Sequence, residues 1–216
     1  MATAHLTMVL EGPLQSWGHS SRYGYRGTAP HPTRSGLTGI ICAAMGLDRG
    51  SEDEAEWLVK INAMRLTCYE VKKNTSYKAG RLVDFHTISG PICANGKISR
   101  DNSITYREYI VDGKFVAVFE GGKEDLVRIG AALADPVWGI WLGRKCCIPS
   151  SRVFRGVAED HDGAIKLAGL KDEKEQLRSI VETESFDEGG CTIRDVPLNF
   201  DTRCYAPRRI RTDIVR

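Results

Sequence analysis

The amino-terminal part of the chain combines cationic, aromatic and glycine residues in a stretch that has no acids. Between Glu11 and Asp48 there is no Asp or Glu. The cations and aromatic residues near its start are Arg22, Arg26, Arg34, Trp17, Tyr23 and Tyr25. Guanidinium groups neutralise phosphates, aromatic rings stack on unpaired bases, and glycines let a backbone approach closely. The combination predicts a surface for single-stranded nucleic acid, with RNA favoured.

The turn at residues 32–36, with the sequence Pro-Thr-Arg-Ser-Gly, is the clearest candidate for a phosphate site. Arg34 places a forked cation beside the Ser35 hydroxyl and the amides of a helix start. An alternative is that Arg34 caps local carbonyl groups, because arginines are common in turns. In the preceding loop, Gln15 and Ser16 are candidates for polar contacts with RNA, whereas Trp17 is expected to pack in the core rather than stack on a base.

Length and composition predict one globular domain or two small ones. The chain has 216 residues, 42% hydrophobic and 27% charged, which are ordinary values for a protein with a real core. The net charge of +2 conceals an asymmetry, since residues 159–190 hold ten acids against four Lys or Arg, whereas the last fourteen residues hold five arginines and one acid. Separate acidic and basic segments favour a polyanion on one side of the molecule and protein partners on another.

The cysteines and histidines do not form a recognisable metal or redox motif. The seven cysteines include no CxxC pair, and the five histidines are scattered without ligand spacing. Residues 36–39 lack the spacing of a phosphate-binding or dinucleotide-binding loop. There is no signal peptide and no 18-residue apolar run. We therefore expect a reduced, cytoplasmic protein without metal or cofactor.

Local patterns predict alternating strands and helices. Strands are expected over 5–11, 64–71, 82–88, 104–111, 114–119 and 137–142, and helices over 37–47, after a capping box at 51–54, and over 123–134. Asp112-Gly113 is typical of a tight hairpin turn between its flanking strands. The order predicts an α+β, ferredoxin-like (RRM-like) antiparallel sheet with helices on one face, over residues 1–148, and a small β-rich region with an acidic insertion over 149–216. A generic RRM-like RNA binder is one alternative, although strand 114–119 lacks the RRM aromatic consensus.

Five segments occur in an order that resembles a known family. They are Gly12–Gly18, Pro32–Leu37, Asp84–Thr87, Thr105–Tyr109 and Leu142–Cys146. Together they resemble the Cas-five family of CRISPR-associated proteins, within the RAMP superfamily, in its type I-E form. The resemblance implies a ferredoxin-like fold with a long thumb hairpin at about residues 84–112. It further implies a non-catalytic subunit of a Cascade complex that holds the 5′ handle of the crRNA, contacts the large subunit and a backbone subunit, and meets target DNA only through the complex.

The resemblance also implies site residues on the thumb and after it. On the thumb, Arg100, Arg107 and Lys97 would face the RNA backbone, and Tyr106 or Tyr109 could wedge a displaced base. The plain alternative is a solvated, charged hairpin. The segment 142–145 resembles the family's loop near the handle, so its cations are candidates for phosphate contacts. These two candidates are Arg144 and Lys145, with ordinary surface charge as their alternative.

An enzymatic alternative rests on one histidine. Related proteins of type I-C systems cleave precursor crRNA without metal, through a Tyr, Lys and His set. Such cleavage needs a base for the 2′-hydroxyl proton and a cation for the developing charge. His86 is the histidine in an RNA-proximal motif, with Tyr77, Lys78 and Arg81 upstream. The Lys–His neighbour pair of the processing relatives is absent, so we expect His86 to contact RNA or to bond to backbone at the thumb base, without catalysis.

Overall fold

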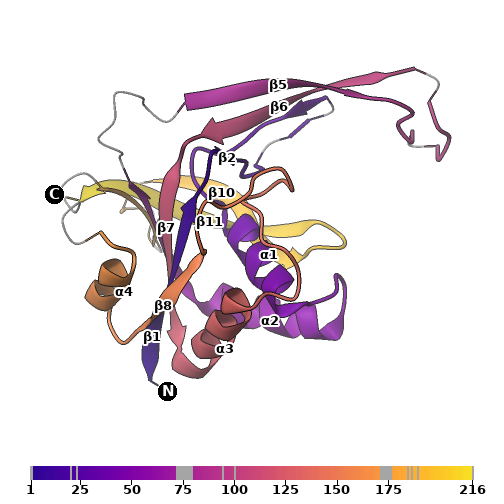
Figure 1. Cartoon of the computed structure of the whole chain (residues 1–216). Coiled ribbons are helices and arrows are strands. Elements are labelled where there is room, and N and C mark those ends of the chain that lie inside the picture. Colours follow the sequence, from indigo (N-terminus) through magenta and orange to yellow (C-terminus); the bar gives the residue numbers. More distant parts are fainter. Residues whose placement is uncertain are drawn as a thin grey trace.

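The computed structural model describes residues 2–19, 21–22, 24–71, 80–93, 95–99, 101–170, 177–183, 185, 187–188 and 190–215. The elements, shown in Figure 1, are β1 (Thr3–Glu11), β2 (Leu14–Gln15), β3 (Tyr25–Arg26), α1 (Arg34–Met45), α2 (Glu52–Ala63), β4 (Arg65–Val71), β5 (Gly80–Ile88), β6 (Ser103–Val111), β7 (Lys114–Gly122), α3 (Lys123–Ala134), β8 (Phe154–Ala158), α4 (His161–Leu167), β9 (Leu177–Thr183), β10 (Cys191–Asn199) and β11 (Cys204–Val215).

The main body is a seven-stranded antiparallel sheet with the order β10-β11-β9-β4-β7-β1-β8. Within it, β8-β1-β7-β4 is the ferredoxin-like arrangement: α1 and α2 connect β1 to β4, and α3 lies between β7 and β8. The predicted α+β class is confirmed. Strands β9, β10 and β11 extend the same sheet beyond β4, and the predicted division at residue 148 stays a prediction.

The strand predicted at 137–142 is wrong, because the fourth ferredoxin strand is β8. Residues 137–138 instead run across the end of α1. The amides of Val137 and Trp138 donate to the carbonyl oxygens of Ala44 and Ala43 at 2.9 and 3.2 Å. The last carbonyls of a helix have no partner within the helix, so this segment satisfies them.

The core lies on both faces of the sheet because alternate strand residues are buried on opposite sides. On β1, Leu6, Met8 and Leu10 belong to the cluster that packs under α1, α2 and α3. Val9 belongs to a second cluster, which includes Ile165 of α4. Three helices therefore cover one face as expected, and α4, which the sequence patterns did not reveal, covers the other. Among the helices of the described ranges, none is long and apolar enough to cross a membrane.

The turn at residues 112–113 is a corner between two sheets and not the hairpin expected from its sequence. Strand β6 pairs with β2, β3 and β5, whereas β7 pairs with β1 and β4. Asp112 adopts a φ of 54°, and the Nε2 atom of Gln15 donates to the Gly113 carbonyl at 2.7 Å. A left-handed Asp followed by Gly bends the chain sharply in either setting. The local signal therefore cannot tell a hairpin from a corner.

The thumb is the β5–β6 hairpin, which is inserted between β4 and β7 and projects away from the body (Figure 1). Its register runs from the pair Gly80 and Val111 at the base to the pair Ile88 and Ser103. The short strands β2 and β3 pair with β6 on the edge opposite β5. The loop that precedes α1 is thereby attached to the base of the thumb.

Candidate nucleic-acid interface

A cleft of about 1450 Å³ lies where the thumb base, α1 and the segment 137–146 meet. One wall comes from β5 and β6 and another from the segment 137–146, with α1 between them. Several predicted site residues line it: Ser16, Arg26, Ser35, His86, Arg107, Arg144 and Lys145. The fold thus brings together candidates from Ser16 to Lys145, which are separated by more than half of the 216-residue sequence.

Other candidates lie elsewhere. Arg22 is exposed, and its backbone bridges to Tyr25 outside the cleft lining. Tyr106 lies on the opposite face of the thumb, where its ring meets Phe85 edge-on at 5.7 Å. Arg100, Tyr23, Tyr77 and Lys78 lie outside the described residues.

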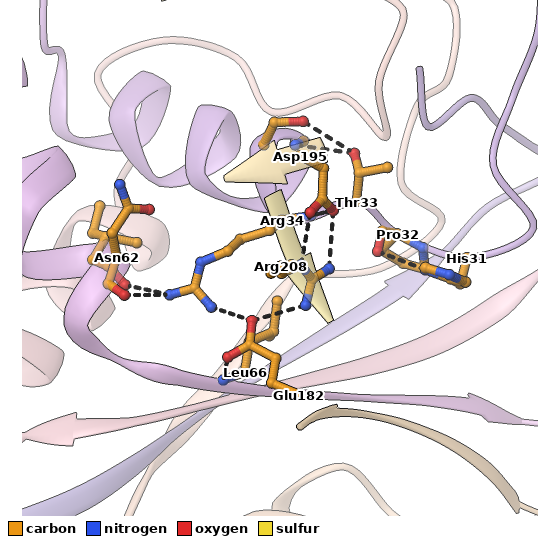
Figure 2. A network of polar contacts seen from close by, with 12 residues as sticks. His31, Pro32, Thr33, Arg34, Asn62, Leu66, Glu182, Asp195 and Arg208 are labelled. Carbon is orange, nitrogen blue, oxygen red and sulfur yellow. Dashed lines mark hydrogen bonds and ion pairs between the residues drawn. The ribbon is translucent and has the colours of Figure 1, made fainter. Parts of the chain in front are cut away.

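Arg34 does not form the predicted phosphate site, because its side chain is buried and only 2% exposed (Figure 2). Its Nη2 atom donates to the carbonyl oxygens of Ile61 (2.8 Å), Asn62 (3.1 Å) and Met64 (2.6 Å), where α2 ends. Its Nη1 atom pairs with the Glu182 carboxylate. The alternative, in which Arg34 caps carbonyl groups, is the one the structure shows.

The Arg34 guanidinium belongs to a buried network of two cations and two anions (Figure 2). Arg208 holds both oxygens of Asp195 at 2.6 and 2.9 Å and reaches Glu182 at 2.8 Å. Asp195 also accepts the backbone amide of Arg34 at 2.8 Å. Because the charges balance and most donors are satisfied, the network can stay buried. It fixes the first residue of α1 against β9, β10 and β11.

Gln15 is also structural, and its predicted RNA contact is wrong. The side chain is fully buried and donates to the carbonyls of Leu10 and Gly113 at 3.0 and 2.7 Å. Its Oε1 atom accepts from the indole of Trp17 at 3.0 Å, and Trp17 is a core residue as expected. Ser16 lines the cleft but is only 4% exposed, and its hydroxyl lies 3.4 Å from the Glu108 carbonyl.

Glu108 of β6 is the centre of the contacts that hold the thumb base. Its carboxylate accepts from the Tyr25 hydroxyl, from the Thr28 amide at 3.2 Å and from Arg81 at 3.3 Å. Its carbonyl accepts from Arg144 at 2.8 Å. One residue therefore joins the loop before α1, both thumb strands and the segment 137–146.

Arg144 has a positioning role at the edge of the cleft. Beyond its bond to Glu108, it donates to the Arg26 carbonyl at 2.9 Å, and its guanidinium lies 4.6 Å from the centre of the Tyr109 ring. The ring is almost fully buried, so Tyr109 has no face to offer a base. Arg144 therefore contributes positive charge to the cleft while its donors tie the segment 137–146 to β3 and β6.

Cations of the cleft lining come from several separate segments. They include the exposed Arg26 on β3 and Lys145 after α3, and the half-buried Arg107 on β6, which donates to the Thr105 hydroxyl at 3.3 Å. His86 faces the same space, and its Nδ1 atom lies 3.7 Å from Asp84, with both side chains nearly half exposed. Cations that converge from several segments on one groove suit a chain of phosphates.

Sequence reasoning missed the aromatic end of the cleft. Trp138, Trp141, Phe200 and Tyr205 line it, together with Arg49. The sequence feature that could have revealed it is the pair of tryptophans on either side of Gly139. Because a strand was expected over 137–142, both tryptophans were treated as part of a sheet. Phe200 comes from the β10–β11 turn and Tyr205 from the start of β11, and no local pattern connects these two residues to the tryptophans.

The contacts of Glu108 make the thumb base sensitive to acid. The pKa of Glu108 is held below its ordinary value of 4.5, mainly by the hydrogen bond from Tyr25. The hydrogen bond from the Thr28 amide and the positive charges of Arg81 and Arg144 lower the pKa further. Because the folded-state pKa is lowered, the carboxylate stabilises the fold above pH 4.5, and this contribution is lost as the pH falls through the lowered pKa.

We therefore expect Glu108→Gln to lower the thermal midpoint at neutral pH, and we expect the difference from wild type to disappear in acid. The measurement is thermal unfolding of both proteins from about pH 7 to about pH 3. A difference that stays constant over that range would show that the charge of Glu108 is not what stabilises the thumb base.

The fold and this cleft define a ferredoxin-like protein with a projecting thumb and a cationic groove. Residues 5–211 match the family described as CRISPR-associated protein (Cas_Cas5). The chain belongs to this family, the Cas-five family, as its five motifs indicated.

Similar proteins support this assignment. The chain is 29% identical over 164 residues to the CRISPR system Cascade subunit CasD of Escherichia coli (strain K12), which covers 74% of this chain and 73% of that protein. Among solved structures, it resembles a chain of a "CRISPR RNA-guided surveillance complex" with a TM-score of 0.75 and 28% identity, over 98% of this chain and 90% of that one. A second structure, "Crystal structure of Cas protein", has a TM-score of 0.67 at 28% identity, with 98% and 94% covered.

Proposed function

We propose that this protein is a non-catalytic subunit of a type I-E Cascade complex that binds and caps the 5′ handle of the crRNA. The observation that carries the proposal is the convergence of Arg26, Arg107 and Lys145 on one cleft in a chain of this family. The handle is single-stranded, so its phosphates can follow these cations while its bases remain free to be read. Arg144 and Ser35, which also line the cleft, complete its polar rim.

The same proposal assigns partners. A backbone subunit and the large subunit would contact this chain, target DNA would be engaged through the assembled complex, and the setting is the cytoplasm. The outer face of the thumb supports a protein or RNA contact, since Phe85 and Tyr106 are 57% and 46% exposed there. Arg22, which lies outside the cleft lining, and Arg100 remain predicted RNA contacts, and the acidic segment 159–190 is assigned to a protein partner.

The first test measures RNA preference. The full chain is titrated with an RNA of the handle sequence and with a scrambled RNA of equal length, and the proteins that co-purify with a tagged chain from its host are identified. We expect tighter binding of the handle RNA and recovery of other Cascade subunits with guide RNA. Equal binding of both RNAs, with no co-purified subunits, would favour a generic RRM-like RNA binder.

A second candidate function, metal-free cleavage of precursor crRNA, is favoured by one observation. His86 faces the cleft beside the cross-strand neighbours Asp84 and Arg107, so an imidazole and a guanidinium lie on the same wall. A base and a cation are the groups that such cleavage requires.

The two functions are separated by incubating the protein with repeat RNA in EDTA. We expect intact RNA, because the proposed subunit binds without cutting. A single cut that is lost in His86→Ala, while Lys123→Ala still cuts, would instead establish the endoribonuclease. Lys123 serves as the control because it is exposed and lies outside the cleft lining.

A further inference from the structure

The cleft has two chemically different ends. The thumb end carries Arg107 and His86, whereas the other end carries four aromatic side chains beside the cation Arg49. These are Trp138, Trp141, Phe200 and Tyr205. Phosphates need cations, but aromatic rings offer flat apolar faces that suit nucleobases. The phosphates of a nucleotide chain therefore match the thumb end of the cleft, and its bases match the aromatic end.

Trp138 is the aromatic residue best placed to receive a ligand. Its backbone is held by the hydrogen bond to Ala43, and Val137 beside it is held by Ala44. The side chain is nevertheless 43% exposed and lines the cleft. A large apolar side chain on a fixed backbone, left open toward a groove, is a feature of binding surfaces. Its indole can stack on a planar ligand with little loss of conformational freedom.

The neighbouring residues keep space open in front of this aromatic wall. Gly39 of α1 faces the cleft, and a Cβ atom there would find only the Phe200 ring, at 3.9 Å. Trp141 already packs against Gly139, where a Cβ would meet its ring at 2.7 Å, and the Lys145 ammonium lies 5.8 Å from the ring centre. Trp141 is thus the member of the aromatic end that lies next to the cation Lys145.

We propose that the aromatic end is a base-stacking subsite in which one unpaired base of the bound RNA stacks on Trp138. This inference rests on the proposed function and adds to it the part of the nucleotide that each end of the cleft binds. Lys145 and Arg107 hold the phosphates, and the base turns toward α1, where Gly39 leaves room. Stacking tolerates any base because every base has a π-face, so this subsite contributes affinity rather than sequence preference.

The test uses handle RNAs that carry the fluorescent base 2-aminopurine at one position at a time. Stacking on an indole quenches this fluorescence, so we expect one position to be quenched by the wild-type chain. Trp138→Leu keeps an apolar side chain but removes the aromatic face. We expect it to abolish the quenching and to weaken binding by roughly 5- to 150-fold, which corresponds to one lost stack. Trp138→Phe is expected to retain part of both effects.

A second measurement separates stacking from a structural role. An RNA that lacks the base at the quenched position should bind wild type as weakly as intact RNA binds Trp138→Leu. The abasic RNA should then bind Trp138→Leu with nearly the same affinity, because both changes remove the same stacking contact. Val127→Ala is the control, because Val127 is 51% exposed on α3, outside the cleft lining.

The outcomes distinguish this subsite from the function on which it rests. If wild type binds handle RNA but no 2-aminopurine position is quenched, the subsite is overturned and the proposed function stands. The same conclusion follows if Trp138→Leu weakens binding by the same factor for every abasic RNA, whichever base is missing. If wild type binds neither handle nor scrambled RNA, the proposed function fails, and the subsite fails with it.

Discussion

Arg34→Ala is expected to lower the free energy of unfolding by about 3–5 kcal/mol, the usual cost of removing one partner from a buried ion pair. The change leaves the carbonyls of the buried residues Ile61 and Met64 without this donor, and it removes one of the two guanidinium partners of the Glu182 carboxylate. Each buried acceptor that loses its partner adds a desolvation penalty. Chemical denaturation of wild type and variant measures the difference.

Arg34→Lys is the companion variant, since it keeps the charge but cannot reproduce the forked set of donors. We expect an intermediate loss of stability. Arg34→Ala could instead unfold at the same denaturant concentration as wild type and no longer retain RNA. That result would show that the carbonyl-capping role is wrong and that Arg34 contacts a phosphate, as its sequence context predicted.

Replacing Arg107 and Lys145 together by alanine is expected to weaken RNA binding by about 150-fold or more, because two charge-assisted contacts of roughly 1.5–3 kcal/mol each are lost. Each lost phosphate contact also lowers the slope of log affinity against log salt, by about 0.7 for a single strand, so the double variant should lose about 1.4. Titration of handle RNA at several salt concentrations measures both quantities. The thermal midpoint should stay the same, since both side chains are at the cleft surface.

The matched control replaces Lys123 and Arg178, which are half exposed, pair with surface carboxylates and lie outside the cleft lining. It removes the same net charge from other faces. If this control weakened binding as much as the cleft variant, the RNA would be held by the overall charge of the chain and not by the groove.

Local signals predicted those parts of the fold that depend on neighbouring residues. The capping box at Ser51 places the start of α2 correctly, since the Ser51 hydroxyl accepts the Glu54 amide at 3.1 Å. Helix α3 begins and ends where its spacing indicated. Asp112-Gly113 predicted a bend, which is present, but the partner of β6 was decided by strands elsewhere in the chain. A turn sequence holds no information about which distant strands its flanking strands will pair with.

The site was predictable in part for the same reason. Arg107 and Lys145, which the family resemblance proposed as phosphate contacts, both line the cleft, and their contact with RNA stays a prediction. Arg34 was misassigned because its partners Glu182 and Asp195 are 148 and 161 residues away in the sequence. Trp138 was missed because its environment is built from the end of α1 and the β10–β11 turn, which meet only in the folded chain.

The position of the thumb between β4 and β7 has an architectural consequence. Glu70 and Phe115 are cross-strand neighbours, so the excursion leaves the central sheet and returns to it at adjacent places. Because its two ends are already side by side, lengthening or shortening the distal arm alters closure entropy only slowly and leaves strand pairing in the body untouched. The length of the thumb can therefore change, residue by residue, without altering the central sheet that supports it.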